Sequence, residues 1–123
     1  MKRRHSRLQV PGSTNFVTTT IVNFLPIFRD EALAKIVLDN IRIYSQKCDI
    51  QVHGFVIMPN HLHLLLTVGH EVCVSQFMGR MKEYSAKEIV NWCLGNKETS
   101  LLTVFSTAAK ESKRGHKYQV WQE

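Results

Sequence analysis

Residues 58–66 read Met58-Pro59-Asn60-His61-Leu62-His63-Leu64-Leu65-Leu66. In a β-strand, residues two apart lie on the same face of the sheet. His61 and His63 are therefore expected on one face, and the alternate leucines that begin at Leu62 on the other. This pattern predicts a strand whose leucines face a layer of helices and whose histidines face an open side of the sheet.

The residues around this strand predict the elements that surround it. A β-branched run predicts a strand over Asn15–Val22, and an N-cap at Asp30 followed by apolar residues at helical spacing predicts a helix over 31–46. The turn Pro59-Asn60 is short enough to join two strands into an antiparallel hairpin. The other predicted elements are strands at Ile50–Met58 and Leu62–Val68, a helix from Val74 ended by Gly95, a short helix from Leu101 through Lys110 and a closing strand at Tyr118–Trp121. This order predicts an α+β fold of the ferredoxin-like split βαβ type, an antiparallel sheet with two helices on one face.

Length and composition describe one domain of 123 residues, in which residues 1–14 form a basic arm. The net charge of +6 favours an anionic partner, most often nucleic acid. No apolar run is long enough to predict a membrane span. The first basic cluster is followed by polar residues and not by an apolar core, so the sequence does not predict a secretory signal. The three cysteines form no C-x-x-C motif, which favours reduced thiols in a cytoplasmic protein.

The two histidines are candidate metal ligands. Two imidazoles on one face of a strand can bind a single divalent ion through their ring nitrogens. Two ligands make half of a site, so a third has to come from elsewhere in the fold. A pair of plain surface histidines is the alternative interpretation of the same spacing.

Residues 55–65, Phe55-Val56-Ile57-Met58-Pro59-Asn60-His61-Leu62-His63-Leu64-Leu65, closely resemble the signature of the HUH-type single-tyrosine transposases, most of all the REP-associated branch. Supporting matches are Val10-Pro11-Gly12, Phe28 and Val120-Trp121-Gln122. The resemblance implies a transposase of a bacterial or archaeal mobile element that cleaves and rejoins single-stranded or hairpin DNA through a 5′-phosphotyrosine intermediate. It also implies that His61 and His63 hold Mg²⁺ or Mn²⁺, and it allows a homodimer.

The nucleophile is where the sequence departs from the family pattern. The family's tyrosine lies on a helix beyond the Trp-Gln segment, whereas this sequence ends at Glu123. The resemblance therefore implies that the C-terminal part of the family domain, with the nucleophile and the third ligand, is absent here. Among the residues present, Tyr84 is a candidate nucleophile, and Glu88, one helical turn further on, is a candidate third ligand.

Basic residues near both ends and on the second helix are candidate DNA contacts, with a solvated charged face as the alternative. They are Arg3, Arg4, Arg80, Lys82, Lys87, Lys113 and Arg114. Two other functions remain open. One is a non-catalytic ferredoxin-like nucleic-acid-binding domain that stacks bases on Phe16 and Phe55. The other is a metallohydrolase, which needs a carboxylate near the histidines, although no Asp or Glu occurs between Gln51 and His70.

Overall fold

The computed structural model of the protein describes residues 12–69, 74–112 and 114–123. In chain order the elements are β1 (Thr14–Thr20), η2 (Val22–Phe24), η3 (Ile27–Arg29), α1 (Glu31–Lys47), β2 (Ile50–Met58), β3 (His61–Val68), α2 (Val74–Gly95) and α3 (Thr99–Ser112). The strands form one sheet in the order β1-β3-β2, and both neighbouring pairs are antiparallel. The predicted α+β fold class is therefore confirmed.

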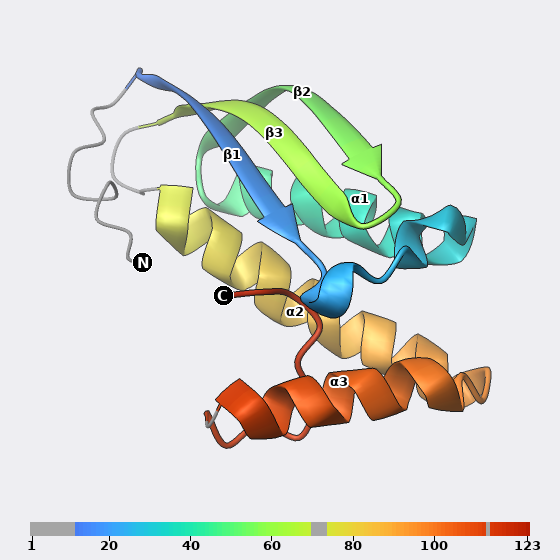
Figure 1. Ribbon diagram of the computed structural model, residues 1–123. Helices are drawn as coiled ribbons and strands as arrows, with labels where there is room; N and C mark the ends of the chain where they lie inside the picture. The colour runs from blue at the N-terminus through green and yellow to red at the C-terminus, as the bar shows by residue number, and fades with distance from the viewer. Residues whose placement is uncertain (1–11, 70–73, 113) are drawn as a thin grey trace.

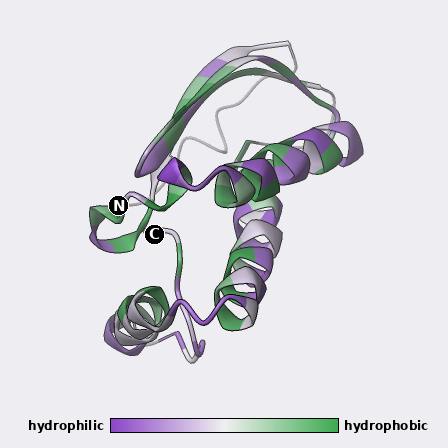
Figure 2. Ribbon diagram, turned by 90° about the vertical axis from the view of Figure 1, so that its right-hand side faces the viewer, coloured by the Kyte–Doolittle hydropathy of each residue, from purple (hydrophilic) through white to green (hydrophobic). Residues whose placement is uncertain are grey.

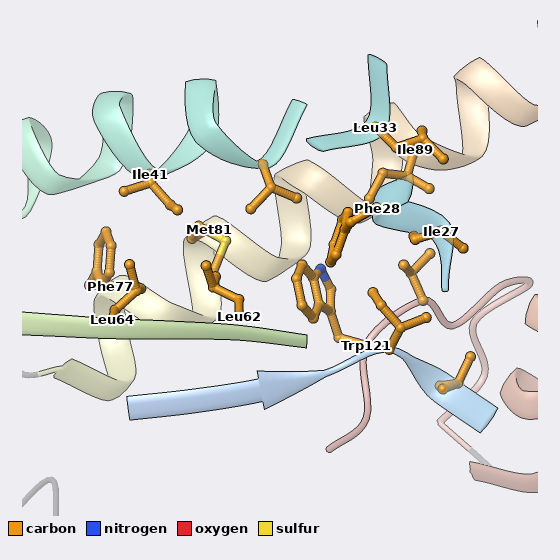
Figure 3. Packing of buried hydrophobic residues seen from close by; sticks show 14 of the residues in the cluster. Ile27, Phe28, Leu33, Ile41, Leu62, Leu64, Phe77, Met81, Ile89 and Trp121 are labelled. Carbon is orange, nitrogen blue, oxygen red and sulfur yellow. The ribbon is translucent and has the colours of Figure 1, made fainter. Parts of the chain in front are cut away.

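The helices gather on one side of the sheet, and α3 packs on α2 farther from the strands (Figure 1, Figure 2). The core lies between the sheet and the helices, where Leu62, Leu64 and Leu66 of β3 are each 0% exposed. Leu62 and Leu64 lie close to Met81 and Phe77 of α2 (Figure 3). The alternation predicted for β3 is thus confirmed. In the described part of the chain, no helix is both long enough and apolar enough to cross a membrane.

The first predicted helix has the predicted cap. The Asp30 carboxylate accepts a hydrogen bond from the backbone N–H of Ala32 at 2.9 Å, which satisfies one of the free donors at the start of α1. The helix then runs from Glu31 to Lys47, one residue longer than predicted. The third helix is also longer than predicted, since it begins at Thr99 and ends at Ser112.

The predicted closing strand is wrong in extent. Residues 118–123 contain a single antiparallel bridge, between Trp121 and Ile21. Backbone bonds from Val22 to Val120 and from Gln122 to Thr20 flank this bridge. In the antiparallel register of this bridge, residues 118–120 lie opposite η2 and not opposite an extended strand, so they form no ladder.

The described thiols are buried. Cys48 and Cys93 are free cysteines inside the core, and Cys73 lies outside the described residues. Burial, with a smaller contribution from the charge of Glu98, raises the pKa of the Cys93 thiol to about 11. A protonated, buried thiol packs as a small apolar side chain, as expected for a structural cysteine.

Candidate functional site

The histidine pair lies on the sheet face turned away from α1 and α2, which we call the open face. His63 pairs across the sheet with Thr18 and Val56, and His61 with Thr20 and Met58. Directly opposed residues share a face, so these neighbours surround the pair. The open face is made of Thr14, Phe16, Thr18, Thr20, Gln51, Gly54, Val56, Met58, His61, His63, Leu65 and Thr67.

The two imidazoles converge through their Nε2 atoms. These atoms lie 3.1 Å apart, and the rings meet edge to face at 85° with their centroids 4.7 Å apart. Each Nδ1 atom has a partner of its own: His61 Nδ1 lies 2.6 Å from Asn60 Oδ1, and His63 Nδ1 lies 2.8 Å from Thr18 Oγ1. An amide oxygen can only accept, so His61 donates from Nδ1 and keeps its lone pair at Nε2. The hydroxyl oxygen of Thr18 can likewise accept a hydrogen bond from His63 Nδ1.

This spacing fits two neighbouring ligands of one divalent ion. At an ion–ligand distance of about 2.1 Å, two ligands at right angles lie about 3.0 Å apart. A metal-binding histidine usually binds the ion through one ring nitrogen and donates a hydrogen bond from the other to a fixed oxygen. Within residues 12–69, 74–112 and 114–123, no group of three or more His, Cys, Asp or Glu side chains could hold a metal ion. The pair could therefore supply two ligands, and the described part of the chain adds no third from these residue types.

Tyr84 and Glu88 lie among the helices. The ring of Tyr84 stacks on that of Tyr44 of α1, with centroids 5.3 Å apart and planes at 10°. The Glu88 carboxylate accepts a bond from the Asn40 amide of α1 at 3.3 Å. Both side chains therefore belong to the contact between α1 and α2, on the covered side of the sheet. The structure does not bring either of them to the histidine pair.

The candidate DNA contacts in the described residues are Arg80, Lys82, Lys87 and Arg114, whereas Arg3, Arg4 and Lys113 lie outside them. Arg80 is exposed on α2. Lys87 Nζ lies 3.6 Å from a Glu83 carboxylate oxygen, and Arg114 is paired with Glu123 at 2.6 Å.

Lys82 Nζ donates to the Gln122 carbonyl at 3.0 Å, beside the end of β1. These basic residues belong to α2 and to the segment after α3. By contrast, the three strands contain no Asp, Glu, Lys or Arg, so they add no charged side chain to the open face.

Two residues at the site had no role assigned from the sequence, and a third, Phe16, was considered only as a base-stacking ring of the non-catalytic alternative. Asn60 and Thr18 hold the two Nδ1 atoms, and the Phe16 ring stacks on the His63 imidazole at a centroid distance of 5.3 Å and an angle of 17°. Asn60 stands next to His61 in the sequence, which is the one signal that could have indicated its role. Thr18 and Phe16 depend on the register of β1 against β3, which the strand patterns alone do not fix.

Asn60 also connects the pair to a strained segment. Its amide donates to the carbonyl of Phe24 at 3.4 Å. Asn23 and Phe24 both have left-handed backbone angles, with φ of 55° and 54°. For a bulky residue such as Phe24 this conformation is costly, and such strain is concentrated at functional sites.

Comparison with known proteins identifies the family of the chain. The family model described as "Transposase IS200 like" matches residues 17–113, which is more than half of the chain. The chain belongs to the IS200-like transposase family. Enzymes of this family generally use divalent metal ions. A search of curated protein sequences finds no match to this IS200-like chain.

Two solved structures have the same fold as this IS200-like chain. One is a REP-associated tyrosine transposase bound to a REP hairpin, with a TM-score of 0.64 and 15% identity over 99% of the chain. The other is a putative transposase from Deinococcus radiodurans R1, with a TM-score of 0.58 and 21% identity over 74% of the chain. The aligned region spans 56% of the first protein and 68% of the second.

Proposed function

We propose that this chain is the metal- and DNA-binding part of a transposase that cleaves and rejoins single-stranded or hairpin DNA. The observation that carries the proposal is the pair of Nε2 atoms 3.1 Å apart on the open face of a chain of the IS200-like family. His61 and His63 hold Mg²⁺ or Mn²⁺ in this proposal. The REP hairpin bound by the structural relative supports hairpin DNA as the class of partner.

The chemistry assigns separate tasks to the protein's residues. His61 and His63 would hold the divalent ion, which would supply positive charge against the phosphoryl oxygens and favour in-line attack. Asn60 accepts from His61 Nδ1 and Thr18 can accept from His63 Nδ1, and in that tautomer both Nε2 lone pairs would face the ion. A tyrosine oxygen then attacks phosphorus, the bond to the 3′ oxygen breaks and that oxygen leaves as a hydroxyl. The 5′ phosphate stays on the tyrosine, so the strand can later be rejoined without ATP.

The positions of the tyrosines favour a nucleophile from outside this chain. Tyr44 and Tyr84 stack on each other between α1 and α2, and burial, followed by the neighbouring Tyr84, raises the pKa of Tyr44. Tyr118 adjoins Gln119, whose backbone N–H bonds to Phe105 of α3. We therefore propose that the attacking tyrosine is none of these three.

The alternative of a non-catalytic binding domain has less support. Such a domain needs aromatic rings gathered on one sheet face. Phe16 pairs with the exposed Leu65, whereas Phe55 pairs with the buried Leu64 and lines a groove with α1. The two rings therefore lie on opposite faces and cannot form one stacking surface.

The test is a covalent trapping experiment. The protein is incubated with Mn²⁺ and a panel of labelled single-stranded hairpins, and the products are separated on a denaturing gel beside a His61→Ala control. We expect Mn²⁺-dependent DNA binding without an adduct to any tyrosine of this chain. An adduct that maps to Tyr84 by peptide mass would contradict the proposed origin of the nucleophile. Binding that persists unchanged in EDTA and in His61→Ala would support the non-catalytic alternative instead.

Asn60→Ala is expected to weaken Mn²⁺ binding by about 10- to 100-fold, because His61 loses the acceptor that fixes its tautomer. Isothermal titration with Mn²⁺ measures the effect. Asn60→Asp keeps an acceptor oxygen at this position and should bind Mn²⁺ at least as well as the wild type. Asn96→Ala is the matched control, since Asn96 is exposed and donates to the Trp92 carbonyl in α2. Equal Mn²⁺ affinities for Asn60→Ala and Asn96→Ala would show that Asn60 does not position His61.

A further inference from the structure

The open face carries an aromatic ring to which the proposed chemistry gives no task. Phe16 lies in the middle of β1 and is 66% exposed, and its ring is stacked on the His63 imidazole. Its cross-strand partner Leu65 is 40% exposed on the same face. Large apolar side chains grouped in this way indicate a surface that binds a partner.

The neighbouring side chains indicate what kind of partner. Along β1 the open face alternates a hydroxyl, a ring and a hydroxyl, from Thr14 through Phe16 to Thr18. A covering protein helix presents a continuous apolar stripe, which this alternation does not match. A nucleotide has a flat apolar base with polar edges next to a phosphate that hydroxyl groups can contact. The strands also contain no acidic residue that would repel a phosphate.

The distance from Phe16 to the histidine pair indicates which nucleotide of a bound strand would contact the Phe16 ring. Phe16 contacts His63 directly, at a centroid distance of 5.3 Å. In a nucleotide, one sugar separates the phosphate from the base. A DNA strand whose phosphate lies at His61 and His63 therefore has a base within reach of the Phe16 ring.

We propose that Phe16, with Leu65 beside it, stacks one unpaired base of the DNA strand next to the phosphate held at the histidine pair. The inference rests on the proposed function and adds a base-binding position to it. A base inside a duplex is already stacked between its neighbours, so this position selects a strand that is single-stranded at the cleavage site.

The first test compares the affinities of variants for a fluorescently labelled single strand in Mn²⁺. Phe16→Ala should bind about 5- to 150-fold more weakly, which is the usual effect of losing one stacked base. Phe16→Trp should keep the wild-type affinity. Without DNA, Phe16→Trp should bind Mn²⁺ as the wild type does, because an aromatic ring still stacks on His63 and the partners of both Nδ1 atoms are unchanged. Phe55→Ala is the matched control, since Phe55 is 51% exposed on the opposite face and should leave DNA affinity unchanged.

The second test locates the base. Abasic sites are placed one at a time along the strand, and each strand is titrated against the wild type and Phe16→Ala. We expect one position at which removing the base weakens wild-type binding but has no further effect on Phe16→Ala. A general loss of fold would instead weaken binding to every strand equally, so this coupling separates stacking from destabilisation.

The outcomes distinguish the two levels of the proposal. Equal DNA affinity of Phe16→Ala and wild type, with Mn²⁺-dependent binding intact, overturns the stacking site and leaves the proposed function standing. Absence of any Mn²⁺-dependent DNA binding by the wild type overturns the proposed function and the stacking site with it. If Phe16→Ala fails to fold, the abasic series is measured on the wild type and on Phe16→Trp. Equal DNA affinity for every abasic position in both proteins then overturns the stacking site.

Discussion

His61→Ala is expected to weaken Mn²⁺ binding by more than about 100-fold, since the loss of a partner that only supports a ligand already costs about 10- to 100-fold. The described residues offer no third His, Cys, Asp or Glu to compensate for the lost Nε2 atom. His63→Ala should have a similar effect, because each histidine supplies one Nε2 atom to the pair. Isothermal titration and the electron paramagnetic resonance signal of free Mn²⁺ both measure the change.

His53→Ala is the matched control for these two variants. His53 lies at the bulge of β2, and its Nε2 atom is bonded to Thr67 Oγ1 rather than to the pair. Its removal therefore deletes an imidazole from the sheet without touching the Nε2 pair. If His61→Ala and His53→Ala bind Mn²⁺ equally well, the histidine pair is not the metal site, and the proposed function loses the observation on which it rests.

DNA binding should follow ion binding in the same variants. The strands add no charged side chain to the open face, so a bound ion is the positive charge expected to attract a phosphate there. We therefore expect His61→Ala to lose the Mn²⁺-dependent part of its DNA affinity, while the part contributed by basic residues such as Arg80 remains. Titrations with and without EDTA separate the two parts.

The sequence predicted those features that depend on a repeating pattern along the chain. The two-residue period of β3 fixed which side chains face the helices, and the short turn at Pro59-Asn60 fixed the antiparallel hairpin. The cap at Asp30 fixed the start of α1. Each of these features is decided by neighbours in sequence, so a single chain is enough to predict it.

The details of the site depend on contacts between distant segments. The convergence of the Nε2 atoms requires particular side-chain rotamers, and the partners Thr18 and Phe16 come from a strand more than forty residues earlier. The extent of the last segment was mispredicted for the same reason. A strand ladder needs an extended partner, and the chain beyond β1 bends into η2 instead.

Trp121→Ala is expected to lower the free energy of unfolding by about 3–5 kcal/mol, the usual cost of truncating a buried aromatic residue. Trp121 is 4% exposed and lies against Phe28, with ring centroids 5.8 Å apart (Figure 3). Its indole N–H donates to the hydroxyl of the fully buried Ser85 at 3.0 Å. For a domain with a total stability of about 5–15 kcal/mol, the loss is large. Urea unfolding followed by circular dichroism measures it.

Two further variants separate the contributions of the ring and of the hydrogen bond. Trp121→Phe keeps one aromatic ring but loses the N–H donor and part of the indole volume, so we expect a cost of about 1–3 kcal/mol, below that of Trp121→Ala. Trp92→Ala removes a half-buried ring of α2 and should cost less than Trp121→Ala. Trp121 also holds the segment whose Gln122 N–H bonds to Thr20, the cross-strand partner of His61. If Trp121→Ala costs no more than Trp92→Ala, that segment is not anchored by its tryptophan, and the bridge beside the histidine pair depends on the backbone bonds alone.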